Sequence, residues 1–316
     1  MSFALVKYMP RTSIGFIRLR FASLVFSSLL MIASLGAFFT WGINFGIDFT
    51  GGVQTEITTE GPADLEQIRS IANGLGLGEA QVQTAGNENR VLVTLPLQEG
   101  EGLEGEQAQQ TARQALVQAM TDSVPGVTIE GSTTIGGAVS GEMVQKGGLA
   151  IGLALFLMLI YIFVAFQWQW QYSLGAIAAL VHDVIATIGI FSVTQMTFDL
   201  ATVAAILTIV GYSMNDTVVV YDRIRENLRK FKKEELANVL NRSINDTLSR
   251  TILTSVTTLL ALIALYIIGG GSLRGFSFAM IWGVLIGTYS SIFVAAPILL
   301  FTDVRRSAFE DEEDND

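Results

Sequence analysis

Several ionisable and polar side chains lie inside long apolar runs, where a charge is costly. Asp216 is the clearest case: it stands in the sequence VGYSMNDTVVVYDRIREN, and Val218–Val220 continue the apolar run beyond it. A carboxylate at the centre of a membrane helix costs about 2.5–3.5 kcal/mol on insertion scales, and such residues commonly relay ions. We therefore predict that Asp216 takes up and releases a proton; the alternative is an interfacial residue that caps one end of a helix. The polar side chains beside it are Ser213, Asn215 and Thr217.

A second carboxylate, Asp183, lies near the middle of the apolar run 173–195. The helical neighbours of Asp183 are small, and small residues let another helix approach closely. Asp183 is therefore expected to face protein and not lipid. It is either a proton or ion relay or a structural hydrogen-bonding group between helices. His182 is adjacent and points to a different face, where a lone histidine is more often structural. The helical neighbours of Asp183 at steps of three and four are Gly175, Ala176, Ala179 and Ala186.

A basic residue, Arg250, opens the apolar run 251–268. Thr254, Thr257 and Thr258 follow it on one helical stripe, which makes a polar track into the run. Arg250 could extend its side chain to the membrane interface, pair with Asp246 one helical turn before it, or approach Asp216 and adjust its protonation. The spacing alone leaves these three interpretations open.

The elements that carry these residues are predicted to be membrane-spanning helices. Of the 316 residues, 50% are hydrophobic and 15% are charged, whereas a soluble domain has about 25% charged residues. A helix of about 20 apolar residues crosses the hydrocarbon layer of a membrane. We predict an α-helical polytopic membrane protein, whose six spans are 21–41, 147–166, 173–195, 199–221, 251–268 and 276–301.

The segment 42–146 interrupts the apolar runs and is predicted to be a separate α+β domain. Strands over 53–59, 80–84, 90–97 and 127–134 alternate with helices over 64–75 and 106–120. The resulting order β-α-β-β-α-β is that of a ferredoxin-like fold. The sequence GIDFTGG precedes the first strand, and its glycines Gly46, Gly51 and Gly52 suit a tight turn; the acid within it is Asp48.

The distribution of charge orients the chain in the membrane. Basic residues gather before the first run, in 1–20, and in the amphipathic segment 222–250, and positive loops stay in the cytoplasm. Both termini are therefore expected there, including the acidic tail 302–316. The segment 42–146 is rich in acids and poor in bases, which suits the opposite side of the membrane.

Composition also excludes several kinds of function. The formal net charge is −10, so nucleic acid is not an expected partner. The chain has no Cys and a single His, which excludes disulfides, Cys nucleophiles and a metal site built on several histidines. We expect no enzyme activity, no metal site and no organic cofactor.

The last apolar run carries small residues at steps of four. Such a ridge allows close helix packing, either within this chain or against another subunit. Its members are Ala279, Gly283, Gly287, Ser291 and Ala295.

Four sequence motifs, in order and over nearly the whole chain, resemble those of the SecD/SecF family of bacterial protein-export subunits, which are relatives of the RND transporters. The longest and most specific is GYSMNDTVVVYDRIREN. The others are GIDFTGG from Gly46, LVHDV from Leu180 and NRSINDTLSRTILTSVTT from Asn241. The chain departs from the family at Gln167–Gln171, where charged residues are common around the tryptophans.

The resemblance implies six spans of an RND-like half and one ferredoxin-like domain outside the membrane. It implies a subunit that pairs with SecD, works beside the SecYEG channel in the bacterial inner membrane, and uses a proton or sodium gradient to draw preproteins outward. Asp216 and Arg250 then correspond to the aspartate and arginine of the ion path, and Asp183 is supported less strongly. The alternatives are half of an RND-type efflux transporter and a scaffold subunit without ion coupling.

Overall fold

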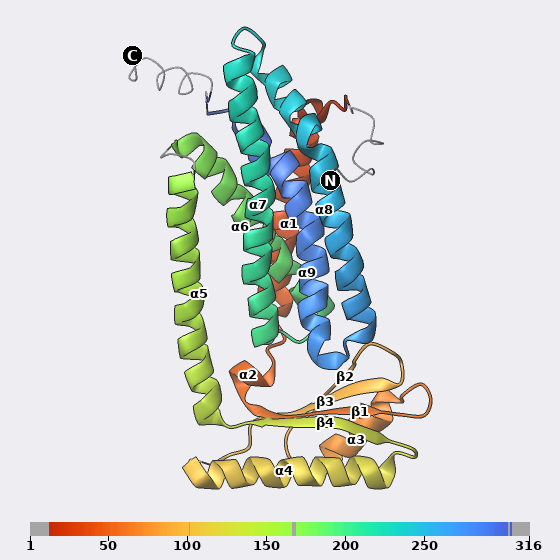
Figure 1. The fold of residues 1–316 in the computed structure, drawn as a ribbon. Helices are drawn as coiled ribbons and strands as arrows, with labels where there is room; N and C mark the ends of the chain where they lie inside the picture. The colour runs from red at the N-terminus through yellow and green to blue at the C-terminus, as the bar shows by residue number, and fades with distance from the viewer. Residues whose placement is uncertain (1–12, 101, 166–168, 303, 305–316) are drawn as a thin grey trace, which may run out of the picture.

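The computed structural model describes residues 13–100, 102–165, 169–302 and 304. It consists of a helical bundle with a small α+β domain at one end (Figure 1). The described part contains six helices long and apolar enough to cross a membrane. They are α1 (Arg20–Trp41, preceded by the 3-10 turn η2, Phe16–Leu19), α5 (Gly137–Ala165), α6 (Trp170–Thr194), α7 (Leu200–Lys230), α8 (Leu236–Ile268) and α9 (Gly271–Ser290), which continues through the π-helical turn η3 (Ser291–Ala295) into α10 (Ala296–Ile298).

Three of these helices extend well beyond the apolar runs that predicted them. α5 begins at Gly137, α7 continues to Lys230, and α8 begins at Leu236. The predicted amphipathic segment 222–250 is therefore the end of one helix and the start of the next. The extensions persist because charged side chains pair along and between them: Arg223 contacts both Glu226 and Asp246, at 2.6 and 2.7 Å. Of the predicted termini 1–20 and 302–316, residues 1–12, 303 and 305–316 lie outside the described residues.

The ridge of small residues in α9 packs inside this chain, against α7. A Cβ atom added at Gly283 would lie 2.2 Å from the side chain of Ile209, and one added at Gly287 would lie 3.0 Å from Ser213. α1 approaches α6 in the same way, because a Cβ at Gly189 would lie 2.2 Å from the hydroxyl of Ser34. These close approaches set the backbones near enough for short polar side chains to meet between helices.

The α+β domain at the end of the bundle, which we call the outer domain after its predicted position, contains a four-stranded antiparallel sheet in the order β2-β3-β1-β4. This order, with the β-α-β-β-α-β succession, is the predicted ferredoxin-like arrangement. Helices α3 and α4 cover the sheet face that points away from the bundle (Figure 1), and the core between them includes Val53, Ile57 and Leu116. The strands are β1 (Gly52–Thr58), β2 (Gln81–Thr84), β3 (Arg90–Leu95) and β4 (Thr128–Ile135), and the helices are α3 (Leu65–Gly74) and α4 (Gly102–Ser123).

The two predicted glycines connect the short helix α2 (Ile47–Thr50) to strand β1. Gly51 and Gly52 have φ angles of 71° and 123°, a region that side-chain-bearing residues rarely adopt. A Cβ at Gly52 would also lie 2.3 Å from the carbonyl oxygen of Leu95. Both glycines are thus required where the chain leaves the membrane bundle and enters the sheet.

Candidate functional site

Asp183 is the centre of a buried hydrogen-bond network that joins three helices. Its carboxylate has no exposed surface. Oδ2 accepts hydrogen bonds from Ser213 Oγ of α7 at 2.6 Å and from Ser290 Oγ of α9 at 2.8 Å. Serine hydroxyls are short, so these distances fix the spacing of α6, α7 and α9 around the carboxylate. The acid is thus held by donors from its neighbours, which favours its interpretation as a structural hydrogen-bonding group.

The other carboxylate oxygen of Asp183 faces the histidine beside it in sequence. His182 Nδ1 lies 3.0 Å from Asp183 Oδ1, and the ring is 1% exposed. The two side chains were expected on different faces of the helix; instead the imidazole turns back toward its neighbour. Its other nitrogen, Nε2, is buried without a hydrogen-bond partner among the described residues. The ring also lies 5.9 Å from that of Tyr289.

The network ends in an irregular stretch of the last helix. Ser290 is the final residue of α9, and the π-helical turn Ser291–Ala295 follows it directly. π-helical turns are rare and often occur at functional sites, because they shift the register of the residues after them. The turn also accepts a hydrogen bond from α7, because the hydroxyl of Tyr221 donates to Ala295 O at 2.9 Å.

Asp216 lies one helical turn after Ser213 on α7, in a contrasting environment. The side chain is 4% exposed, and its Oδ2 is buried without a hydrogen-bond partner among the described residues. A buried carboxyl oxygen without a donor is unfavourable, so the site is one that a proton or cation would stabilise. The geometry therefore supplies an acceptor that is not already satisfied.

Arg250 does not form an ion pair with Asp216, because the ion pairs within 4.0 Å in the described part of the chain do not include these two residues. Arg250 is exposed at the surface of α8. Of the three interpretations, the pair with Asp246 is not formed either, because Asp246 binds Arg223.

A row of hydroxyl groups continues from this region between α7, α8 and α9. Tyr212 OH donates to Ser255 Oγ at 3.2 Å, and Ser255 Oγ lies 2.7 Å from Thr288 Oγ1. Thr251 Oγ1, one turn before Ser255, is buried and has no hydrogen-bond partner in the part of the chain that the structure covers. Thr251, Thr288 and Ser290 were not predicted as site residues, because they lie on other helices than Asp183 and Asp216 and no local pattern groups them.

The remaining predicted residues are divided between buried and exposed positions. Thr217 is buried and donates to Ser213 O of its own helix. Thr254 is only partly buried, and it donates to Arg250 O of its own helix. Asn215 is exposed on α7 and stands apart from the buried groups. No group of three or more His, Asp or Glu side chains that could hold a metal ion occurs among the described residues.

The GIDFTGG motif joins the outer domain to the start of α7. Asp48 Oδ2 accepts a hydrogen bond from the backbone N–H of Leu200 at 2.9 Å, which is the first residue of that helix. Gly46 N donates to Phe198 O at 2.9 Å. Asp199 accepts from Thr202 N at 2.7 Å and so caps the same helix. The helix that carries Asp216 is therefore tied to the GIDFTGG motif by the carboxylate of Asp48 and by the backbone bond from Gly46 to Phe198.

Membrane-length helices with buried carboxylates between them, and an α+β domain inserted after the first, define a membrane transport protein. The sequence matches two family profiles: the C-terminal domain of the protein export membrane proteins SecD/SecF over residues 115–305, and the SecD/SecF GG motif over residues 36–63. The chain belongs to the SecD/SecF family, and within it to the SecF subunits.

Curated relatives and solved structures agree with this assignment. The protein translocase subunit SecF of Rhodobacter capsulatus is 43% identical and covers 97% of this chain and 94% of its own. SecF of Pseudomonas aeruginosa is 43% identical and covers 92% of each chain. The crystal structure of SecDF from Thermus thermophilus, described as translocon-associated, matches at 34% identity with a TM-score of 0.79 over 92% of this chain. This chain spans 38% of that SecDF chain.

Proposed function

We propose that this chain is the SecF-type subunit of a protein-export complex and that Asp216 binds the coupling ion, H⁺ or Na⁺. The observation that carries the proposal is the buried Asp216 Oδ2, which has no donor among the described residues. Arg250 is the charge partner, since its guanidinium acts on the same carboxyl group from the surface of α8. Moving one charge across a 100 mV potential supplies about 2.3 kcal/mol, enough to bias a two-state element.

Binding at Asp216 would be transmitted outward along α7. The start of this helix is bonded to the GIDFTGG motif through Asp48, and the motif leads directly into strand β1. A shift of α7 relative to α9 would therefore move the outer domain.

The partner subunit is proposed to be SecD, which would cover a polar face of the membrane helices. Asn215 is exposed on α7, and Arg250 and Thr257 are exposed on α8. Polar and charged side chains within membrane helices face protein or water and not lipid. The complex would act beside SecYEG on translocating preproteins, in the bacterial inner membrane, with the outer domain outside and both termini in the cytoplasm.

The test of ion coupling is the substitution Asp216→Asn, which keeps the size of the side chain and removes its titration. Export in membrane vesicles should lose its dependence on the ion gradient, at least tenfold, while the protein is still inserted at normal levels. Asp222→Asn is the matched control: it lies on the same helix, is exposed, and should export normally. If export by Asp216→Asn still depends on the ion gradient as it does in the unmodified protein, ion coupling at Asp216 is wrong and the scaffold function remains.

The proposed partner face is tested by cross-linking. The chain has no Cys, so an introduced Asn215→Cys is unique in it. We expect this cysteine to form disulfides with cysteines placed along the membrane helices of SecD. A cysteine at Leu153, an exposed apolar residue of α5, is the control for a lipid-facing position. Equal cross-linking at the two positions would contradict the assignment of this face.

A further inference from the structure

The turn between α7 and α8 carries basic side chains that the proposed ion coupling does not use. Arg229 and Lys230 are the last residues of α7, Lys233 lies in the turn before α8, and all three are exposed. We call these three residues the basic turn. No acid stands between its first and last members. Figure 1 shows this turn at the end of the bundle that is furthest from the outer domain.

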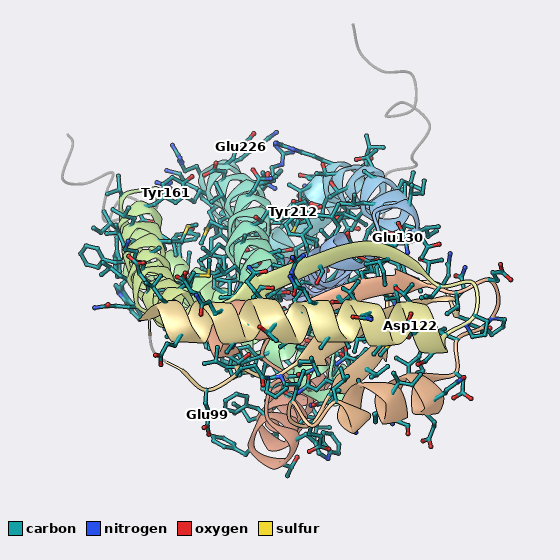
Figure 2. The ribbon with its side chains drawn as sticks, turned by 90° about the horizontal axis from the view of Figure 1, so that it is seen from below. Glu99, Asp122, Glu130, Tyr161, Tyr212 and Glu226 are labelled. Carbon is teal, nitrogen blue, oxygen red and sulfur yellow. The ribbon has the colours of Figure 1, made fainter. Side chains whose placement is uncertain are left out.

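The acids closest to the basic turn in the packed helices are already bound by two other arginines. Glu226 and Asp246 contact Arg223, and Glu234 contacts Arg242 at 3.0 Å. Figure 2 shows Glu226 at the margin of the bundle. The residues of the basic turn form no ion pair within 4.0 Å with another residue that the structure describes. With seven basic and four acidic residues, the segment 222–242 has a net charge of +3.

The basic turn is held in place by an aromatic ring. The ring of Phe231 has the guanidinium of Arg242 at 4.2 Å from its centroid and the ammonium of Lys230 at 5.6 Å. Its backbone N–H donates to Asn227 O at 2.8 Å, and its carbonyl accepts from Glu234 N at 3.0 Å. A partner of the basic turn therefore meets an ordered surface, and less freedom is lost on binding.

The basic turn is expected beyond the layer of lipid headgroups. The apolar run of α7 ends at Tyr221, and Arg229 follows eight residues later, which is about 12 Å at the helical rise of 1.5 Å per residue. Headgroups add only about 5–8 Å on each side of the hydrocarbon layer. Lipid phosphates are therefore not its nearest anions, and an acidic protein segment fits the position better.

The chain itself supplies an acidic segment near the basic turn. Residues 310–316, EDEEDND, contain six acids and no base. The described chain reaches Val304, which is buried in the same core cluster as Leu228 of α7. The first two residues of the basic turn directly follow Leu228. The acidic segment begins six residues after Val304, and an extended chain covers about 20 Å in that length, so it can reach the basic turn.

The last part of the described chain also lies on the appropriate side of α7. The hydroxyl of Tyr221 donates to Ala295 O at 2.9 Å, directly before α10. Leu228 is seven residues after Tyr221, which is about two helical turns, so the two side chains share one side of the helix. The chain therefore leaves the bundle along the side of α7 that leads to the basic turn.

We propose that the acidic segment 310–316 binds the basic turn of the same chain. A single exposed ion pair is weak and is screened by salt. Here several pairs form together, and the short connection keeps the two partners at a high effective concentration. The contact would hold the ends of α7 and α8 together on the side of the bundle opposite the outer domain. The proposal does not depend on ion coupling at Asp216.

The test forms a disulfide between the two parts, because the chain has no Cys of its own. Asn315→Cys lies in the acidic segment, and Asn238→Cys lies at an exposed position in the first turn of α8; neither changes a charge. The full chain in nanodiscs of phosphatidylcholine is oxidised with copper phenanthroline. In the matched control the six acids are replaced by their amides, so that the length and reach of the segment are unchanged.

At low salt, we expect the disulfide within one chain to form at least fivefold faster with the acids than with the amides. The difference should disappear in about 1 M salt, where the Debye length is about 3 Å. Equal rates in the two chains at low salt, or disulfides only between separate chains, would overturn the proposal.

Charge reversal tests whether the two parts pair directly. The combined variant Arg229→Glu, Lys230→Glu and Lys233→Glu should slow the disulfide at least fivefold. Replacing the six acids by Lys in that same variant should restore the rate to within about twofold of the original. A rate that stays low after the second reversal would contradict direct pairing.

Anionic lipid is the competing occupant of the basic turn. In nanodiscs of phosphatidylglycerol, the rate of disulfide formation should stay within about twofold of the rate in phosphatidylcholine. A fall to the rate of the amide control would show that lipid phosphates displace the acidic segment, and would contradict the proposal.

Discussion

Asp183 and Asp216 are the same residue type, both buried in one helical bundle, yet their surroundings differ in kind. Asp183 accepts two serine hydroxyls at 2.6 and 2.8 Å and has a histidine nitrogen at 3.0 Å. Asp216 has a carboxyl oxygen with no donor among the described residues, and it forms no ion pair with Arg250 there. The difference teaches that burial alone does not identify an ion site: an acid whose bonds are complete holds helices together, and an incomplete one is free to bind.

The largest expected difference in stability is between two single variants, one without the carboxylate of Asp183 and one without that of Asp216. Asp183→Ala leaves two serine hydroxyls and an imidazole without their acceptor, so we expect a loss of about 2–4 kcal/mol in the free energy of unfolding. Asp216→Ala removes a carboxyl oxygen that had no donor and should change stability by less than about 1 kcal/mol. Unfolding by SDS in mixed micelles measures both. Equal losses at the two positions would break the comparison.

The two serines around Asp183 should show a smaller and coupled effect. Hydrogen bonds between membrane helices are worth about 0.6 kcal/mol on average and about 1.7 at most. Ser213→Ala and Ser290→Ala should each cost about this much in the same unfolding assay. Both hydroxyls donate to the same oxygen, Oδ2. The loss of unfolding free energy in the double variant should therefore differ from the sum of the two single losses. Strict additivity would show that the carboxylate does not couple α7 to α9.

The smallest effect is expected at Thr251, a buried residue of α8. Its hydroxyl is buried without a partner among the described residues, so Thr251→Val removes an unsatisfied group and keeps the shape of the side chain. The free energy of unfolding should change by less than about 0.5 kcal/mol or rise slightly. Ser255→Ala is the control, since its hydroxyl is bonded to Thr288 and its loss should destabilise. A large loss at Thr251 would indicate a partner there.

Much of the architecture was predictable because it depends on local patterns. The apolar runs predicted the six helices, and the alternation with turn residues predicted the strands and helices of the outer domain. Asp216 was recognised from one stretch of sequence, as was the glycine pair before β1. What could not be predicted depends on helix rotation: Ser290 is far from Asp183 in sequence, and nothing local shows that their side chains meet. The charge spacing over 222–230 predicted a helical surface, which is the end of α7, but the pairing of Arg223 with Asp246 across α7 and α8 depends on how the helices pack.

The length of α7 has a mechanical consequence. At 1.5 Å per residue, its 31 residues form a rod of about 46 Å, longer than the hydrocarbon layer of about 30 Å. Asp216 lies next to its midpoint, so the proposed ion site would lie at the pivot of a tilting helix. A tilt of about 5° around that pivot would displace each tip by about 2 Å, in opposite directions. The first residue of α7, Leu200, is hydrogen-bonded to Asp48 beside the outer domain. Near the other end of α7, Asn227 is hydrogen-bonded to Ser243 of α8. Protonation at the proposed site would then displace residues at both ends of α7 at once.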